Sequence, residues 1–135
     1  MRRWVVAAAL LVAGCGVQPT EPIGGSPATG ALVFLVRNGS VVPVLRPTRH
    51  QTGPSAALAL LAEGPSPGEL ADGYRSEVPY EADPVSIQDS TVTLSLDVTT
   101  LSTVAVSQIV CTTAIPGPVT LQGGGQTRGP ASCPV

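Results

Sequence analysis

The dipeptide Asn38-Gly39 separates two runs of β-branched and other apolar residues, ALVFLVR before it and SVVPVLR after it. Asn-Gly readily adopts the positive φ angles of a type I′ turn, which joins two antiparallel strands through two residues. The sequence therefore predicts a β-hairpin over residues 31–46. Pro43 lies inside the second run and has no N–H to donate, so we expect that strand at a sheet edge or at a bulge.

The segment that follows this hairpin has the composition and the ends of a helix. Pro54 suits a first turn, Gly64-Pro65 suits a stop, and the residues between them are mainly Ala and Leu. These features predict a helix of about ten residues with Leu58, Leu61 and Ala62 on one face.

A second, shorter helical turn is expected directly afterwards. Ser66 and Glu69 have the spacing of a capping box, in which each residue satisfies the other's backbone N–H. Gly73 would end this turn, and residues 74–84 would form a connecting loop.

Residues 85–96 alternate between apolar and polar side chains around Asp89-Ser90. A period of two is typical of strands with one face in the core, so we expect a second hairpin here. One face of this hairpin would be polar.

The region from Leu101 to Ala114 is expected to be a helix capped by Thr99 or Thr100, although its β-branched residues would also suit a strand. Residues 117–125, GPVTLQGGG, predict a last strand that ends in a glycine turn. The tail to Val135 is expected to be a loop unless Cys133 holds it in place.

The expected order of elements is ββαββαβ, and 135 residues suffice for one core. This order predicts an α+β fold, with two helices packed on one face of a small mixed sheet. We assign residues 31–135 to this domain.

The N-terminus, MRRWVVAAALLVAGC, has the parts of a secretory signal: two arginines, a short apolar run and small residues. The run is too short to span a bilayer, and Val12-Ala13-Gly14-Cys15 resembles the lipobox of bacterial lipoproteins. The resemblance implies cleavage after residue 14 and lipidation of Cys15. The alternatives are an ordinary signal peptide with a chance cysteine and a twin-arginine export signal.

Residues 15–30 would then hold the lipid anchor and a flexible linker rich in Pro and Gly, with a reach of about 20 Å. The expected location is the extracytoplasmic face of the cell membrane. Without residues 1–14 the chain keeps five arginines against nine acidic residues, and its aromatic residues are Phe34, Tyr74 and Tyr80. Basic patches and stacking platforms are therefore missing, so we do not expect nucleic-acid binding.

The sequence has three cysteines, and once Cys15 is assigned to lipid the remaining two form an even pair. Cys111 and Cys133 would lie in an oxidising compartment, where a disulfide would add roughly 3 kcal/mol to stability. Free thiols remain the alternative. No metal site is expected, because two sulfurs and the single His50 fall short of the usual four ligands and lack CxxC spacing.

Several stretches in order resemble the GerMN domain, which is named for sporulation and spore germination and occurs in actinobacterial lipoproteins. These stretches are VFLVRNGSVVPVLRP, LLAEGPSP, VTLSLD and SQIVCTTAIPGPV, within residues 31 to about 123. The resemblance implies a compact domain with no known catalytic residues, used in cell-envelope assemblies and in some lipoproteins near sensor kinases. The glycine run 123–125 departs from the acidic or Asp-Gly turn that members often have.

The residues considered as candidates for catalysis or ligand binding are better explained by ordinary structural roles. Gln108 on an apolar helix stripe could mark a site, but its amide is better explained by hydrogen bonds to a neighbouring backbone. Neither Ser55 nor Ser66 is in a nucleophile elbow, and His50 has no evident nucleophile or acid beside it. The remaining candidates are clustered carboxylates that lack a metal-loop pattern and aromatic platforms, namely Glu77, Glu81 and Asp83.

We therefore expect a non-catalytic, membrane-anchored lipoprotein that has no cofactor and binds a protein partner in the envelope. The alternative is a module that binds a small ligand or cell-wall glycan.

Overall fold

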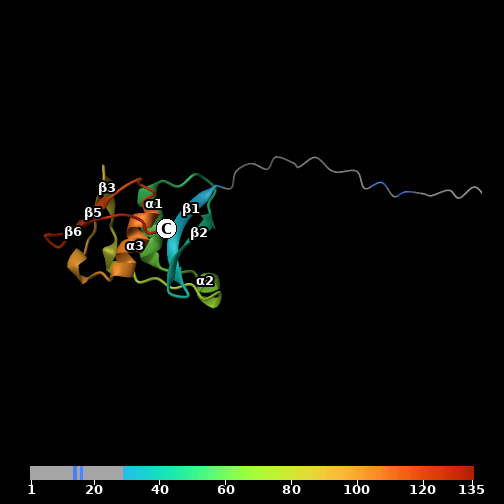
Figure 1. The fold of residues 1–135 in the computed structure, drawn as a ribbon, viewed down its shortest axis with the longest axis horizontal. Coiled ribbons are helices and arrows are strands. Elements are labelled where there is room, and N and C mark those ends of the chain that lie inside the picture. The colour runs from blue at the N-terminus through green and yellow to red at the C-terminus, as the bar shows by residue number, and fades with distance from the viewer. Residues whose placement is uncertain (1–13, 15, 17–28) are drawn as a thin grey trace, which may run out of the picture.

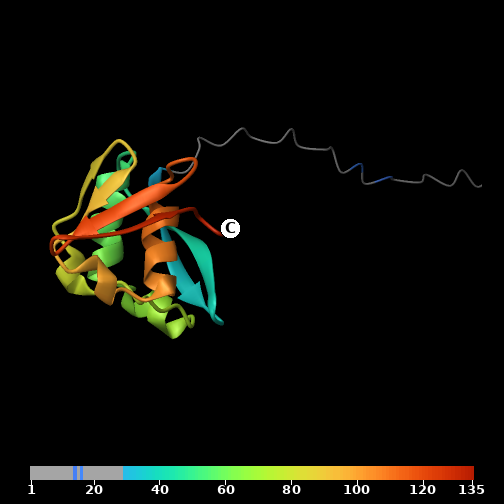
Figure 2. The same ribbon diagram turned by 60° about the vertical axis from the view of Figure 1, so that its left-hand side comes forward.

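Helices fill the space between two small β-sheets in the computed structural model, which describes residues 14, 16 and 29–135 (Figure 1). In chain order the elements are β1 (Gly30–Arg37), β2 (Ser40–Pro47), α1 (Pro54–Glu63), α2 (Pro67–Ala71), the 3₁₀ turn η1 (Tyr80–Ala82), β3 (Ser86–Gln88), β4 (Thr91–Thr93), the 3₁₀ turn η2 (Val98–Thr100), α3 (Thr103–Thr112), β5 (Val119–Gly123) and β6 (Gln126–Ala131). Turning the molecule shows the β1–β2 hairpin on one side of α1 and α3 and the other sheet on the opposite side (Figure 2).

The first hairpin is confirmed with its turn. Strands β1 and β2 pair from Gly30↔Pro47 to Arg37↔Ser40 without a register shift. Asn38 and Gly39 have φ angles of 51° and 76°, as a type I′ turn requires. Among the described strands β2 pairs with β1 alone, so Pro43 lies on an edge strand and not at a bulge.

The second sheet has the order β3-β4-β5-β6 and is mixed. Strands β4 and β5 are parallel, and α3 lies in the connection between them, whereas the other pairs are antiparallel. The predicted hairpin around Asp89 is confirmed, and Asp89 has a φ of 53°.

Strand β6 lies where a loop was expected unless Cys133 held the tail in place, and Cys133 does form a disulfide. Gly124 and Gly125 have φ angles of 64° and 72° and return the chain antiparallel to β5. The strand was not predicted from the sequence RGPA because Gly and Pro are both rare inside strands.

The helix expected before Gly64 and the shorter one expected after it are both confirmed. Helix α1 begins at Pro54, and Gly64 at its end has a φ of 88°. The capping box of α2 is complete: Ser66 Oγ accepts from the Glu69 N–H at 3.2 Å, and Glu69 Oε1 accepts from the Ser66 N–H at 2.8 Å.

The third helix forms as expected, but its start was predicted wrongly. Ser102 is the N-cap, and its hydroxyl oxygen accepts from the Ala105 N–H at 3.0 Å. Thr99 and Thr100 belong instead to η2. Asp97 caps that turn by accepting from the backbone N–H of Thr99 at 2.9 Å.

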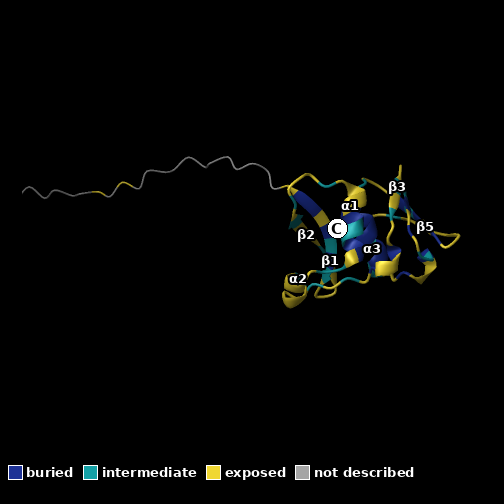
Figure 3. Ribbon diagram, turned by 180° about the vertical axis from the view of Figure 1, so that it is seen from behind, coloured by how far each residue is buried: buried dark blue, intermediate teal, exposed yellow. Residues whose placement is uncertain are grey.

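The core lies where both sheets meet the helices. Helices α1 and α3 each contact β1, α1 also contacts β3, and α3 contacts β6. Figure 3 shows buried residues gathered on α3 and alternating with more exposed ones along β1, whereas α2 is largely exposed. No helix within the described part of the chain is long and apolar enough to cross a membrane.

The predicted fold class, α+β, is confirmed. The strands form two sheets and not the single sheet that was expected, and the helices therefore have a sheet on both sides. Helices buried on two sides need the nearly uniform apolar character that Ala and Leu give α1 and that Val and Ile give α3.

Candidate functional site

The predicted cysteine pair forms a disulfide in the structure. Cys111 and Cys133 are bonded, with Cα atoms 4.8 Å apart. Cys111 is buried in the last turn of α3, and Cys133 follows β6, so the bond fastens the end of the chain to the central helix. Cys15, the predicted lipidation site, lies outside the described residues.

Gln108 is fully buried and has the structural role expected of it. Its Nε2 donates to the Phe34 carbonyl at 2.9 Å and to Ser76 Oγ at 3.1 Å. Its Oε1 accepts from the Glu77 N–H at 2.9 Å. Because both ends of the amide are satisfied by the protein, this side chain is not available to a ligand.

The other candidate residues for catalysis do not come together. Ser66 is a helix cap, and Ser55 is exposed in the first turn of α1. The His50 side chain is exposed and makes no hydrogen bond to another described residue. The carboxylates considered for a metal or a sugar-cleaving pair are all exposed, at Glu77, Glu81 and Asp83.

Within residues 29–135 no group of three His, Cys, Asp or Glu side chains is arranged to hold a metal ion. The single described histidine, His50, also makes no side-chain hydrogen bond to a described serine, cysteine or carboxylate. Two surfaces stand out by their composition.

The first surface is the outward face of the β1–β2 hairpin. Residues directly opposite each other in an antiparallel pair point to the same face, and every other residue along a strand does so too. On β1 and β2 the inward face buries Ala31, Val33 and Leu35. The outward face, which we call the hairpin face, consists of Leu32, Phe34, Val36, Val41, Pro43 and Leu45.

Each of the three opposed pairs on the hairpin face is apolar, and Leu32 and Leu45 are each 46% exposed. An ordinary solvent-facing strand would alternate with polar residues here. A hollow of about 280 Å³ adjoins Leu32, between Thr52 and Thr112. The hairpin face therefore leaves apolar surface in water beside a depression in the domain.

The charged residues within this hairpin are all basic. Neither strand nor the turn between them contains Asp or Glu. The exposed arginines of the described chain, Arg37, Arg49 and Arg75, all lie on or beside the hairpin. Arg37 lies at the end of β1 with its guanidinium 5.1 Å from the Tyr74 ring centroid, Arg49 follows β2, and Arg75 pairs with Val36.

An ion pair on the inner side attaches the hairpin to the helices. Arg46 Nη2 lies 2.7 Å from Glu69 Oε1, and its Nη1 and Nη2 also donate to the carbonyls of Leu60 and Gly64 at the end of α1. The hydrogen bond from Arg46 holds the pKa of Glu69 below its ordinary value, against the opposing effect of burial. Polar contacts of Arg46 thus attach the hairpin to α1 and α2.

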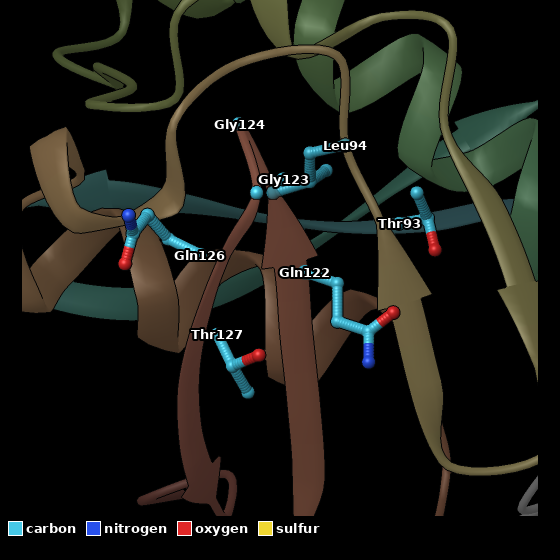
Figure 4. Close-up of a pocket in the computed structure, with 8 residues that line it drawn as sticks. Thr93, Leu94, Gln122, Gly123, Gly124, Gln126 and Thr127 are labelled. Carbon is cyan, nitrogen blue, oxygen red and sulfur yellow. The ribbon is translucent and has the colours of Figure 1, made fainter.

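The second surface is a shallow groove on the outward face of the other sheet, which we call the polar groove (Figure 4). Two hollows of about 420 and 270 Å³ share Thr93 and Gln122 as lining residues. Thr127, Gln122 and Thr93 come from β6, β5 and β4 and lie side by side across the sheet. Asp89 lines the hollow at the β3–β4 turn.

The glycine turn closes one end of the polar groove. A Cβ on Gly123 would overlap the backbone oxygen of Leu96, and one on Gly124 would lie 2.6 Å from Asp97 Cα. These glycines therefore permit close packing of the turn against the segment before η2. This packing accounts for glycine at positions 123 and 124.

Neither surface was recognised from the sequence. The strand sequences did contain the signal for the hairpin face. Both strands are apolar at almost every position, so neither face of the hairpin could be polar. The polar groove depends on β6 and on the parallel pairing of β4 with β5. This pairing brings together Thr93 and Gln122, which the whole of α3 separates in the sequence.

Together these features define a small α+β domain with one exposed apolar face and one polar groove. The chain is similar to the solved tandem GerMN domains of the sporulation protein GerM from Bacillus subtilis, with a TM-score of 0.51 and 24% identity. The similarity covers 79% of this chain and 43% of the GerM chain. This protein therefore spans less than half of the length of the solved GerM chain. The fold is therefore GerMN-like. Neither the protein-family models nor the curated proteins gave a match.

Proposed function

We propose that this protein is a lipid-anchored, non-catalytic docking domain on the extracytoplasmic face of the cell membrane. The lipobox-like residues before Cys15 support the anchor, and residues 15–30 would be the tether. The disulfide between Cys111 and Cys133 is consistent with an oxidising compartment. The scattered positions of the titratable side chains support a binding role over an enzymatic one.

The uninterrupted apolar hairpin face carries the docking proposal. Contiguous exposed apolar surface is a common feature of protein-binding sites. The flanking arginines favour a partner whose own apolar patch is bordered by acidic side chains. We therefore assign the hairpin face to an envelope protein of that kind and not to a second copy, which would bring the same arginines to the interface.

The docking proposal is tested by crosslinking in intact cells. A photoreactive residue in place of Val36, in the hairpin face, should capture one defined protein, and the same residue in place of Leu70 on α2 should not. The double variant Leu32→Ser/Leu45→Ser should lose the capture. Leu70→Ser is the matched control, because Leu70 is also an exposed leucine, at 43%.

Capture that is independent of position, or that survives Leu32→Ser/Leu45→Ser, would refute docking through the hairpin face. Crosslinks between two copies of this chain would assign the face to self-association instead. Crosslinks to lipid would assign it to the bilayer.

The anchor is tested separately. The wild-type chain should enter the detergent phase of a Triton X-114 partition and carry the mass of a diacylglyceryl group on Cys15. Cys15→Ser should remove that mass and leave the precursor uncleaved after residue 14. An unmodified Cys15 in the mature wild-type protein would exclude the lipoprotein assignment.

A further inference from the structure

We propose that the polar groove binds a segment of a neutral, polyhydroxylated ligand, a glycan chain without acidic groups. This site is on a different sheet from the hairpin face, and the helices lie between them (Figure 2). The proposal is therefore independent of the docking function.

The outward face of the sheet is uniform in its chemistry. The register places Thr91 opposite Thr120 and Thr93 opposite Gln122, and Gln122 opposite Thr127. All of these side chains are hydroxyls or amides, which can donate and accept hydrogen bonds at once. None of them forms a side-chain hydrogen bond within the described chain, so their full capacity is available to a ligand.

The charges select against an anion. Among the described residues, Asp89 is the one charged residue that lines the polar groove. The exposed arginines of the described chain lie instead around the hairpin. A ligand with carboxylates or phosphates would meet Asp89 and find no cation, whereas sugar hydroxyls and N-acetyl groups match the Thr and Gln side chains.

The geometry of the groove suits an extended chain laid across the strands. Neighbouring strands are about 4.8 Å apart, so Thr93, Gln122 and Thr127 form a ladder of polar groups at regular intervals. The glycine turn at one end has no side chains, so a sugar ring can approach the backbone there. Without an aromatic platform, binding depends on hydrogen bonds and is expected to be weak, in the millimolar range.

The test is an NMR titration of the full chain in a detergent without a sugar headgroup. The probes are N,N′,N″-triacetylchitotriose, a neutral oligosaccharide called chitotriose below, and trigalacturonate, an anionic one of the same length. Chitotriose should shift the amide signals of Thr93, Gln122 and Thr127 in a saturable way. Trigalacturonate should leave them unchanged.

The double variant Thr93→Ala/Gln122→Ala should weaken chitotriose binding about tenfold or more. Its matched control is Thr103→Ala/Gln51→Ala, which alters exposed residues of the same types outside the groove and should bind as wild type does. Leu32→Ser/Leu45→Ser should also bind as wild type, which separates this site from the docking function.

Three results would overturn the proposal. They are the absence of saturable shifts up to the solubility limit of chitotriose, shifts that map outside the groove, and an equal response to trigalacturonate.

Discussion

The side-chain amide of Gln108 donates to the backbone carbonyl of Phe34, 74 residues earlier in the chain. Thr112, one turn further along α3, accepts from the Phe34 N–H at 3.1 Å. Two helical side chains thus satisfy the backbone groups that a neighbouring strand would otherwise pair with. Arg75 continues this edge by exchanging two backbone hydrogen bonds with Val36, each 2.7 Å long. The position of the hairpin on the helices therefore depends on polar contacts as well as on packing.

Replacing Gln108 by Leu should destabilise the domain strongly. The variant keeps the volume but leaves the Phe34 carbonyl and the Glu77 N–H without their partner. We expect the free energy of unfolding to fall by about 3 kcal/mol. Urea denaturation followed by circular dichroism measures it. The exposed glutamine variant Gln51→Leu should change it by less than about 0.5 kcal/mol, and an equally small change for Gln108→Leu would contradict this role.

Gly123→Ala should also be destabilising, because the turn between β5 and β6 packs without space for a methyl group. The new Cβ would overlap the Leu96 carbonyl oxygen and lie 2.9 Å from that of Leu94. Overpacking of this kind costs about 1–3 kcal/mol. Gly68→Ala is the control, since its Cβ in α2 meets nothing within 4 Å. Thermal unfolding should show a lower melting temperature for Gly123→Ala and no loss for Gly68→Ala.

The sequence predicted well those elements whose signals are local. The Asn38-Gly39 turn, the capping box of Ser66 and Glu69, and the limits of α1 each depend on residues only a few positions apart. Their backbone conformations follow from steric preferences and short-range hydrogen bonds, which are not changed by the rest of the fold.

The elements that were missed depend on distant contacts. Strand β6 is held by pairing with β5 and by Arg128, which donates to the carbonyls of Val98 and Leu101. Helix α3 starts later than predicted because the Asp97 side chain accepts hydrogen bonds from Thr99, which belongs to a separate 3₁₀ turn. Pairing between strands and competition between neighbouring caps cannot be read from periodicity alone.

Reduction of the disulfide should lower stability without abolishing the fold, because the apolar core extends over both sheets and both long helices and not only around the two cysteines. Cys111 and Cys133 are 22 positions apart, and closing such a loop contributes about 3 kcal/mol. Intact-mass analysis should show a gain of two hydrogens on reduction. Denaturation in urea should then occur at a lower midpoint. The variant Cys111→Ala/Cys133→Ala should be insensitive to reductant; a reductant effect in it, or none in wild type, would contradict the assignment.

Acid should weaken the link between the hairpin and α2. Because Arg46 lowers the pKa of Glu69 from its ordinary 4.5, this carboxylate stabilises the folded state above the unfolded-state pKa. That contribution is lost as pH falls through the lower, folded-state pKa. Glu69→Gln should cost about 1–3 kcal/mol at pH 7, and its deficit against wild type should shrink from pH 5 downward. Urea unfolding across pH measures the gap, with exposed Glu63→Gln as the charge-loss control. A deficit that stayed constant down to pH 3 would show that the stabilisation does not come from the ionised carboxylate.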